Sequence, residues 1–306
     1  MKTTIFTLLS IFLFGIAFAQ DGNLPGDANC DGVVNVVDVI TLSNYYIGNA
    51  PEPFCFINAD VNGDGEINIM DITLTVDIFI DDDPGDDTVT DIDGNIYQTV
   101  AIGGHTWMAE NLRVTRYNNE DNIPTGFSNT DWTETTSGAY AIYNDDDDML
   151  EAYGKLYNWY AVADSRGLCP DGWRLPTNDE WSSFTNYLID NYEYTVSNVG
   201  NALKDCRQVS SPLGGDCDTN EHPRWNQHFS QHGNDAFGFS VLPGGARMAN
   251  NGTYSGLGAF GAIWTATPQD NNAFMRSFNH NSGAVTNNNM DKKFGMSVRC
   301  IMETDH

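Results

Sequence analysis

Two twelve-residue segments near the start of the chain carry oxygen-bearing side chains at a spacing typical of calcium ligands. They read DANCDGVVNVVD at 27–38 and DVNGDGEINIMD at 60–71, an offset of 33 residues. In both, Asp or Asn occupies loop positions 1, 3, 5, 9 and 12, and Gly occupies position 6. Calcium takes about six to eight oxygen ligands, and a loop that turns sharply at position 6 can supply them.

The duplication predicts two bound Ca²⁺ ions. The backbone carbonyl at position 7 would add one oxygen to each set, and position 12 is Asp in both loops, where EF-hand loops have Glu. The predicted ligands of the first loop are Asp27, Asn29, Asp31, Val33, Asn35 and Asp38. Those of the second loop are Asp60, Asn62, Asp64, Glu66, Asn68 and Asp71.

One helix is expected after each loop, and none before the first. The tripeptide LPG at 24–26 leaves no room for an entering helix, whereas apolar segments follow the loops at 39–48 and 72–80. The second segment alternates apolar and polar residues like a strand, yet it also has apolar residues at helical spacing, and we expect a helix. A calcium loop with one exit helix, occurring twice, resembles the dockerin module of cellulosome-type assemblies.

The dockerin resemblance implies a docking role. In dockerins the exit helices form the face that binds a cohesin, so the implied partner is a cohesin-like scaffold protein. Val36, Val37, Ile69 and Met70 match positions that often carry recognition, where many dockerins have hydroxyl residues. A hydrophobic interface and simple core packing are both open explanations of their apolar character.

The first residues are typical of a secretory signal peptide. An apolar run at 5–18 and the small-x-small motif AFA at 17–19 predict cleavage after residue 19 and a secreted or cell-surface protein. No later apolar segment is long enough to predict membrane insertion. The expected organisation is a signal peptide at 1–19, a dockerin-like module at 20–80, an acidic linker at 81–90 and a large domain at 91–306.

The protein is strongly acidic, and its charged residues are unevenly distributed along the chain. From Gln20 to Asp91 the chain has 16 acidic residues and no Lys or Arg, and the whole protein has a net charge of -28. Such a surface argues against nucleic acid or an anionic membrane as a partner. It suits an extracellular protein that holds Ca²⁺.

The large domain is rich in Trp, Tyr, Gly and Asn and has short segments bounded by turns, which indicates a loop-rich α+β fold. We expect a hairpin at Asp93-Gly94 and a helix that starts at Thr177 with Glu180 in a capping box. Short strands are expected near 239–242, 262–267 and 296–301.

Segments such as CPDGWRLPTNDEW at 169–181 and FGMSVRC at 294–300 look like the Fibrobacter succinogenes major paralogous domain, or FISUMP. They are also similar to C-type-lectin-like and formylglycine-generating-enzyme folds. The expected fold class is therefore α+β, a small all-α dockerin-like calcium module followed by a loop-rich C-type-lectin-like domain. The activity of the FISUMP family is poorly defined, so this resemblance implies fold rather than function.

Six cysteines in an exported chain predict disulfide bonds. Proximity in sequence favours Cys206–Cys217. In C-type-lectin-like domains a cysteine near the first helix pairs with one near the C-terminus, so that resemblance implies Cys169–Cys300. This leaves Cys30–Cys55 inside the calcium module.

No catalytic arrangement is recognisable, and we expect no enzyme. An oxidase like the formylglycine-generating enzyme needs a reactive cysteine pair late in the chain, where only Cys300 stands. Glu110 and Glu180 are candidate glycosidase carboxylates, but a cap or an internal hydrogen bond explains them at least as well. His228 and His232 have metal-like spacing without the Glu of a zinc-protease motif, which favours an exposed polar pair.

Binding is the better prediction for the large domain. Trp132 and Trp225 lie in polar segments outside the family landmarks, so we expect them on the surface as candidates for stacking on a glycan. The favoured function is a secreted, non-catalytic calcium-binding protein that docks onto a cohesin and displays a lectin-like domain to glycan or protein. The alternatives are a hydrolase of extracellular polysaccharide degradation and a structural adhesion protein with a purely stabilising calcium module.

Overall fold

The computed structural model describes residues 24–81 and 88–303, and the chain divides into two compact units between Gly85 and Asp86. We call residues 24–81 the small unit and residues 88–303 the large unit, and describe each by itself. The predicted signal peptide and most of the predicted linker lie outside the described residues. Regular structure reaches into both ends of that linker, since Asp81 ends a helix and residues 88–90 form a strand.

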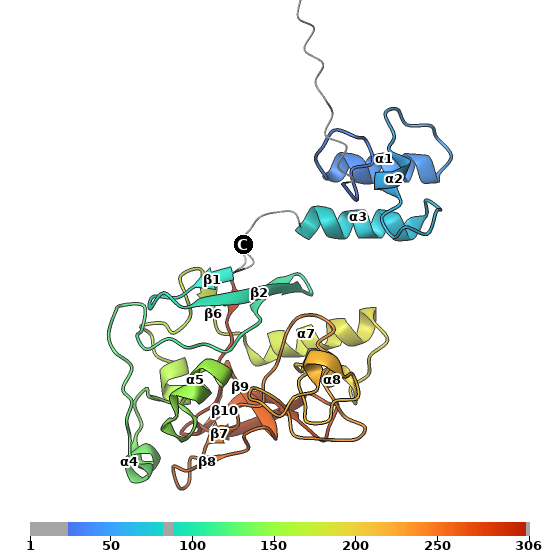
Figure 1. Ribbon diagram of the computed structural model, residues 1–306. Helices are drawn as coiled ribbons and strands as arrows, with labels where there is room; N and C mark the ends of the chain where they lie inside the picture. The colour runs from blue at the N-terminus through green and yellow to red at the C-terminus, as the bar shows by residue number, and fades with distance from the viewer. Residues whose placement is uncertain (1–23, 82–87, 304–306) are drawn as a thin grey trace, which may run out of the picture. The chain divides into compact units, whose positions relative to one another are not determined.

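Three helices make up the described small unit: α1 (Val36–Tyr46), α2 (Phe56–Ala59) and α3 (Ile69–Asp81) (Figure 1). α1 and α3 each begin near the end of a predicted calcium loop and pack against each other. The helix predicted over 72–80 is confirmed. A helix satisfies its backbone hydrogen bonds internally, whereas a strand in this unit would have no partner strand. No helix within the described residues is long and apolar enough to cross a bilayer.

The apolar core of the small unit is limited. Ala28, Leu42 and Ala59 are fully buried, and Phe54 and Ile72 are among the half-buried side chains that pack against them. A domain of about 60 residues buries a small share of its surface and commonly needs a metal or a disulfide for stability. The stability of the small unit therefore needs a contribution beyond its apolar core.

Two antiparallel sheets organise the large unit, one with strand order β1-β2-β3-β12-β6 and one with order β11-β10-β9. β4 pairs with β5, and β7 pairs with β8. This mixture of strands and helices confirms the predicted α+β class. The strands are β1 (Thr88–Thr90), β2 (Ile96–Ile102), β3 (His105–Met108), β4 (Tyr140–Ala141), β5 (Leu156–Tyr157), β6 (Trp173–Arg174), β7 (Ala246–Arg247), β8 (Tyr254–Ser255), β9 (Phe260–Gln269), β10 (Asn272–Asn279), β11 (Thr286–Asp291) and β12 (Ile301–Met302). The helices are α4 (Asn129–Glu134), α5 (Asp147–Tyr153), α6 (Trp159–Val162), α7 (Asn178–Asn191) and α8 (Val199–Leu203), with 3-10 turns η1 (Tyr143–Asp145) and η2 (Gly215–Cys217).

The structure contains some of the predicted strands and turns and lacks others. The hairpin predicted at Asp93-Gly94 is confirmed, since this turn joins β1 to β2. The strand predicted at 262–267 lies within β9, but the one predicted at 239–242 forms only an isolated bridge at Val241. Residues 296–301 likewise form isolated bridges and reach a regular strand only at Ile301, because their partners come from several elements.

The C-terminal strand ties the large unit together. Ile301 of β12 pairs with Trp107 of β3 and with Arg174 of β6. The preceding residue, Cys300, forms a disulfide with Cys169, and their Cα atoms are 5.9 Å apart. All three expected disulfides are confirmed: Cys30–Cys55, Cys169–Cys300 and Cys206–Cys217.

Helix α7 begins with the predicted capping box. The Thr177 hydroxyl accepts a hydrogen bond from the Glu180 N–H, and the Glu180 carboxylate accepts one from the Thr177 N–H. Arg174 donates to the same carboxylate at 2.9 Å. Burial alone would raise the pKa of Glu180, but the hydrogen bonds from Arg174 and Thr177 outweigh it and lower the pKa to about 2. Glu180 is therefore committed to holding the start of the helix.

We expect Glu180→Gln to destabilise the large unit by roughly 2 kcal/mol at neutral pH, because it removes the charged acceptor of these hydrogen bonds. The folded pKa is about 2 and the ordinary value is 4.5. The carboxylate therefore stabilises the fold fully above its ordinary pKa and loses this contribution as the pH falls toward 2. Urea unfolding of both proteins should differ at neutral pH and converge in acid; equal stability at neutral pH would contradict this role.

Candidate functional site

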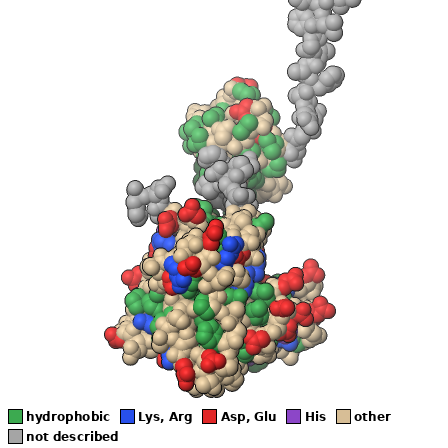
Figure 2. All heavy atoms as spheres, turned by 90° about the vertical axis from the view of Figure 1, so that its left-hand side faces the viewer, with side chains coloured by type: hydrophobic (Ala, Val, Ile, Leu, Met, Phe, Trp, Pro, Cys, Tyr) green, Lys and Arg blue, Asp and Glu red, His purple; other side chains and the backbone are tan. Residues whose placement is uncertain are grey.

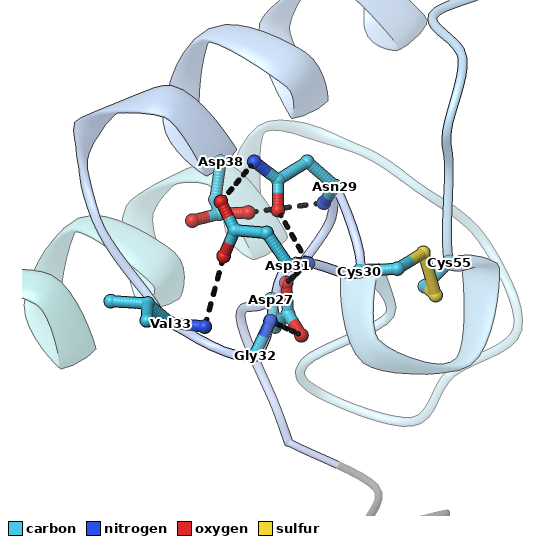
Figure 3. Close-up of a disulfide and its surroundings, with 8 residues drawn as sticks. All are labelled: Asp27, Asn29, Cys30, Asp31, Gly32, Val33, Asp38 and Cys55. Atoms are coloured by element: carbon cyan, nitrogen blue, oxygen red, sulfur yellow. Dashed lines mark hydrogen bonds between the residues drawn. A yellow bond between two sulfur atoms is a disulfide. The ribbon is translucent and has the colours of Figure 1, made fainter. Parts of the chain in front are cut away.

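The first loop, residues 27–38, closes around its own carboxylates (Figure 3). Asp27 accepts a hydrogen bond from the Asp31 N–H at 3.0 Å, and Asp38 accepts one from the Asn29 N–H at 3.0 Å. The Asn29 amide donates to the Asp31 carboxylate at 2.8 Å. These hydrogen bonds link the residues at positions 1, 3, 5 and 12 across the loop.

The second loop, residues 60–71, repeats these contacts. Asp60 accepts a hydrogen bond from the Asp64 N–H at 3.1 Å, and Asp71 accepts one from the Asn62 N–H at 3.4 Å. The Asn62 amide donates to the Asp64 carboxylate at 2.9 Å. The same residue spacing therefore produces the same loop twice.

Positions 9 and 12 couple each loop to the helix that follows it. The Asn35 side-chain oxygen accepts from the Val37 N–H at 2.8 Å, and the Asp38 carboxylate accepts from the Asn35 N–H at 2.9 Å, so the two residues cap α1. Asn68 and Asp71 make the same contacts at the start of α3. Because the position-9 oxygen is engaged at the cap, a bridging water is its expected route to a cation.

The buried carboxylates of the small unit have no cationic side chain within that unit. Asp38 and Asp71 are fully buried and Asp27 is 4% exposed, yet residues 24–81 contain no Lys, Arg or His. An unpaired buried carboxylate is costly, and backbone hydrogen bonds offset only part of that cost. A Ca²⁺ ion in each loop would supply the missing charge.

The donor set favours a hard cation. Within the described residues, no three His, Cys, Asp or Glu side chains lie close enough together to hold a metal ion by themselves. A cation in either loop would therefore also need the Asn29 or Asn62 amide oxygen and the position-7 carbonyl of Val33 or Glu66. Carboxylate, amide and carbonyl oxygens suit Ca²⁺ rather than Zn²⁺.

Comparison with known families agrees with this architecture. The dockerin type I domain matches residues 25–76, which span both loops. The Fibrobacter succinogenes major domain matches residues 100–302, about two thirds of the chain. The chain belongs to the Fibrobacter succinogenes major domain family. No curated protein and no solved structure shows significant similarity to it.

Both predicted resemblances are confirmed: a dockerin domain is followed by a Fibrobacter succinogenes major domain, hereafter the major domain. Dockerin type I domains bind calcium and dock onto cohesin scaffold partners, and they occur in extracellular proteins. Neither family is a known enzyme family. The two loops described above lie within the dockerin match.

Exposed apolar side chains gather on the dockerin domain, which holds more than half of those found among the described residues. Figure 2 shows many of them on the face it presents. On α1, Val36, Val37 and Ile40 are 52, 48 and 54% exposed; on α3, Ile69 and Met70 are 61 and 53% exposed. Core packing therefore does not explain the apolar character of these positions.

The Cys30–Cys55 disulfide joins the first loop to the segment before α2. At position 4 of the second loop, Gly63 has a φ of +70°, and Cys30 adopts nearly the same value, +63°, in the first loop. A side chain in this left-handed region costs roughly 1–2 kcal/mol. The disulfide, together with the hydrogen bond from the Cys55 N–H to the Ala28 carbonyl at 2.9 Å, holds the first loop in this conformation.

Removing this disulfide by Cys30→Gly with Cys55→Ala should lower the stability of the dockerin domain by roughly 1–2 kcal/mol. Loss of a cross-link that closes a 25-residue separation costs about 3 kcal/mol, and glycine at position 30 recovers roughly 1–2 kcal/mol because no side chain then occupies the left-handed region. Glycine at position 30 reproduces Gly63, so the loop itself keeps an allowed backbone. Urea unfolding in saturating calcium measures the change. Cys206→Ala with Cys217→Ala is the control in the major domain, and an unchanged dockerin transition in the first variant would refute the stabilising role.

The prediction that Trp132 and Trp225 lie on the surface is wrong. Trp132 is fully buried: its indole N–H donates to the Lys293 carbonyl at 2.8 Å, and the Arg247 guanidinium lies 4.5 Å from its ring. Trp225 is 1% exposed and lies under the Lys204 ammonium at 5.2 Å. Their polar sequence neighbours gave no sign of these distant partners, and large aromatic side chains contribute most when buried.

The other candidate residues have structural contacts. Glu110 accepts from the Gln98 N–H at 2.9 Å and pairs with Arg113 at 2.6 Å. His228 stacks on Phe229 with ring centroids 4.9 Å apart. With His232 it forms no metal-binding cluster within the described residues.

Proposed function

We propose that the protein is secreted and that its dockerin domain, with one Ca²⁺ ion in each loop, docks onto a cohesin-type partner. The observation that carries this proposal is the pair of matching loops whose buried Asp38 and Asp71 have no cationic side chain within residues 24–81. The same two residues cap α1 and α3, so a bound cation would stabilise both helices. Three disulfides suit an oxidising, extracellular setting.

The docking surface in this proposal consists of Val36, Val37, Ile69 and Met70, extended by Ile40. These side chains are 48–61% exposed and lie in the first half of α1 and at the start of α3. None carries a charge, so docking would be driven by burial of apolar area. Val36 and Val37 occupy positions 10 and 11 of the first loop, and Ile69 and Met70 occupy the same positions of the second loop, which favours two related docking faces.

In this proposal the major domain is displayed by the dockerin rather than acting as a catalyst, and it binds glycan or protein. The ion pairs of Glu110 with Arg113 and of Glu180 with Arg174, at 2.6 and 2.5 Å, support this choice. They orient both carboxylates toward internal partners.

A hydrolase of extracellular polysaccharides is the second candidate. One observation favours it: a cavity of about 440 Å³ is lined by the carboxylates of Glu110, Asp148 and Glu151. Hydrolysis of a glycosidic bond needs two such groups across the sugar. Release of reducing sugar from polysaccharide by the full chain would favour this candidate over display.

Binding of the full chain to cohesin domains, with calcium and after chelation, tests the proposed function. Capture that requires calcium supports it. A calcium-loaded protein that binds none of the cohesins of its own organism would instead favour a structural adhesion protein whose calcium module is purely stabilising.

A further inference from the structure

Three segments of the major domain that are distant in sequence converge at one place: residues 195–201, 226–234 and 279–284. We call them the three-loop surface. The Gly200 N–H donates to the Gly283 carbonyl at 2.7 Å, and the Asn201 amide donates to the Gln231 side chain at 3.0 Å. A Cβ on Gly283 would lie 2.6 Å from the Ser197 carbonyl, so glycine permits this close approach.

The buried Lys204 side chain holds the third segment, residues 279–284, in place. Its side chain is 1% exposed, and its ammonium donates to the carbonyls of Asn279 and Ser282 at 3.0 Å each. The second segment is anchored as well, since the Gln208 amide donates to the His228 carbonyl at 3.0 Å. The three-loop surface is therefore built on buried polar supports.

The three-loop surface is uncharged within a strongly acidic protein. None of its segments contains Asp, Glu, Lys or Arg, although these residues make up 18% of the chain and give a net charge of -28. Amide and hydroxyl groups dominate its exposed polar side chains. They are Thr195, Ser197, Asn198, Gln227, Ser230, Asn234 and Asn281.

Phe229 is an exposed apolar residue on this otherwise polar surface. It is 91% exposed, more than any other large apolar side chain of the described residues. Its ring stacks on His228 at an interplanar angle of 22°, and His280 meets the His228 ring edge-on at a centroid distance of 6.3 Å. His228 is itself fixed, because its Nδ1 accepts from the Gln231 N–H at 3.0 Å. The His228 ring thus orients the Phe229 ring, which stays almost wholly exposed to solvent.

We propose that the three-loop surface binds a neutral oligosaccharide, with Phe229 stacked on a sugar ring and the surrounding amides and hydroxyls hydrogen-bonded to the sugar hydroxyls. Sugar rings present C–H groups on their faces and hydroxyls at their edges, which match an aromatic ring flanked by neutral polar groups. The absence of charge selects against acidic glycans, which the net charge of the protein also repels. The inference rests on the display function proposed above and names its ligand class.

Calorimetry of the full chain with neutral hexasaccharides of glucose, xylose and mannose, and with polygalacturonate as the acidic comparison, tests this inference. We expect binding within the neutral set, weakened at least about tenfold by Phe229→Ala and retained by Phe229→Tyr. Ile96→Ala, which removes a side chain that is 57% exposed on β2, should leave binding unchanged. No binding by any neutral sugar, preference for polygalacturonate, or full binding by Phe229→Ala would overturn it.

The same titrations in chelator separate this inference from the docking proposal. Sugar binding that persists in chelator and depends on Phe229 supports the three-loop surface even if no cohesin binds. Calcium-dependent cohesin binding without any sugar binding overturns the three-loop surface and leaves docking intact.

Discussion

Removal of calcium from the full chain is expected to unfold the dockerin domain while the major domain stays folded. Asp38 and Asp71 are fully buried in a unit that has no cationic side chain over residues 24–81, and the core around Leu42 is too limited to offset them. An ion present at 100 times its dissociation constant contributes about 2.7 kcal/mol. Two ions then contribute on the order of 5 kcal/mol, comparable to the whole stability of a small domain. Hydrogen exchange, analysed separately over 24–81 and 88–303, measures the effect.

The matched variants separate metal loss from general charge effects. Asp27→Ala with Asp60→Ala should reproduce the unfolding in saturating calcium, because each substitution removes a position-1 ligand. Asp147→Ala with Asp148→Ala removes two exposed carboxylates of the major domain and should change neither unit. Continued protection of residues 24–81 in chelator would contradict a calcium-dependent fold.

Substitution of Val36, Val37, Ile69 and Met70 by Asp is expected to abolish cohesin docking without loss of calcium. The four side chains are 48–61% exposed, so the fold tolerates the change, but a charge at each position must be desolvated against an apolar partner surface. Loss of several such contacts should weaken binding at least about a hundredfold. Surface plasmon resonance with an immobilised cohesin, in saturating calcium, measures the affinity.

The two halves of this surface can be tested against each other. If the faces at the ends of the two loops are equivalent, substitution of Val36 and Val37 alone, or of Ile69 and Met70 alone, should leave substantial binding. Phe56→Asp with Ile57→Asp is the matched control, because these α2 side chains are 42 and 75% exposed but have no counterpart in the repeat. A control pair as damaging as the four substitutions together would mean that added charge, rather than this surface, controls docking.

The calcium loops could be read from sequence because their geometry is local. All proposed ligands of a loop lie within twelve residues, and glycine at position 6 specifies the turn at φ +85° in both loops. The α7 capping box followed equally from Thr177 and Glu180, three residues apart. Such features need no knowledge of the tertiary fold.

The side chains that face solvent in the major domain could not be predicted in this way. The indole N–H of the buried Trp132 donates to a carbonyl that lies 161 residues further along the chain. The polar residues next to Trp132 in the sequence had instead predicted a side chain on the surface. Phe229 lies between His228 and His232, which the sequence predicted as an exposed polar pair, and nothing in that pattern singled out the ring between them. The approach of residues 279–284 to this segment follows from contacts made through Lys204 and Gly283, which are distant in the sequence.

Calorimetric titration of Ca²⁺ into the metal-free full chain tests the central claim most directly. The account predicts two ions per chain, and none for the Asp27→Ala, Asp60→Ala variant. A wild-type chain that binds no calcium, or a double variant that still binds two ions, would contradict the assignment of residues 27–38 and 60–71 as the metal sites that hold the dockerin domain in its docking form.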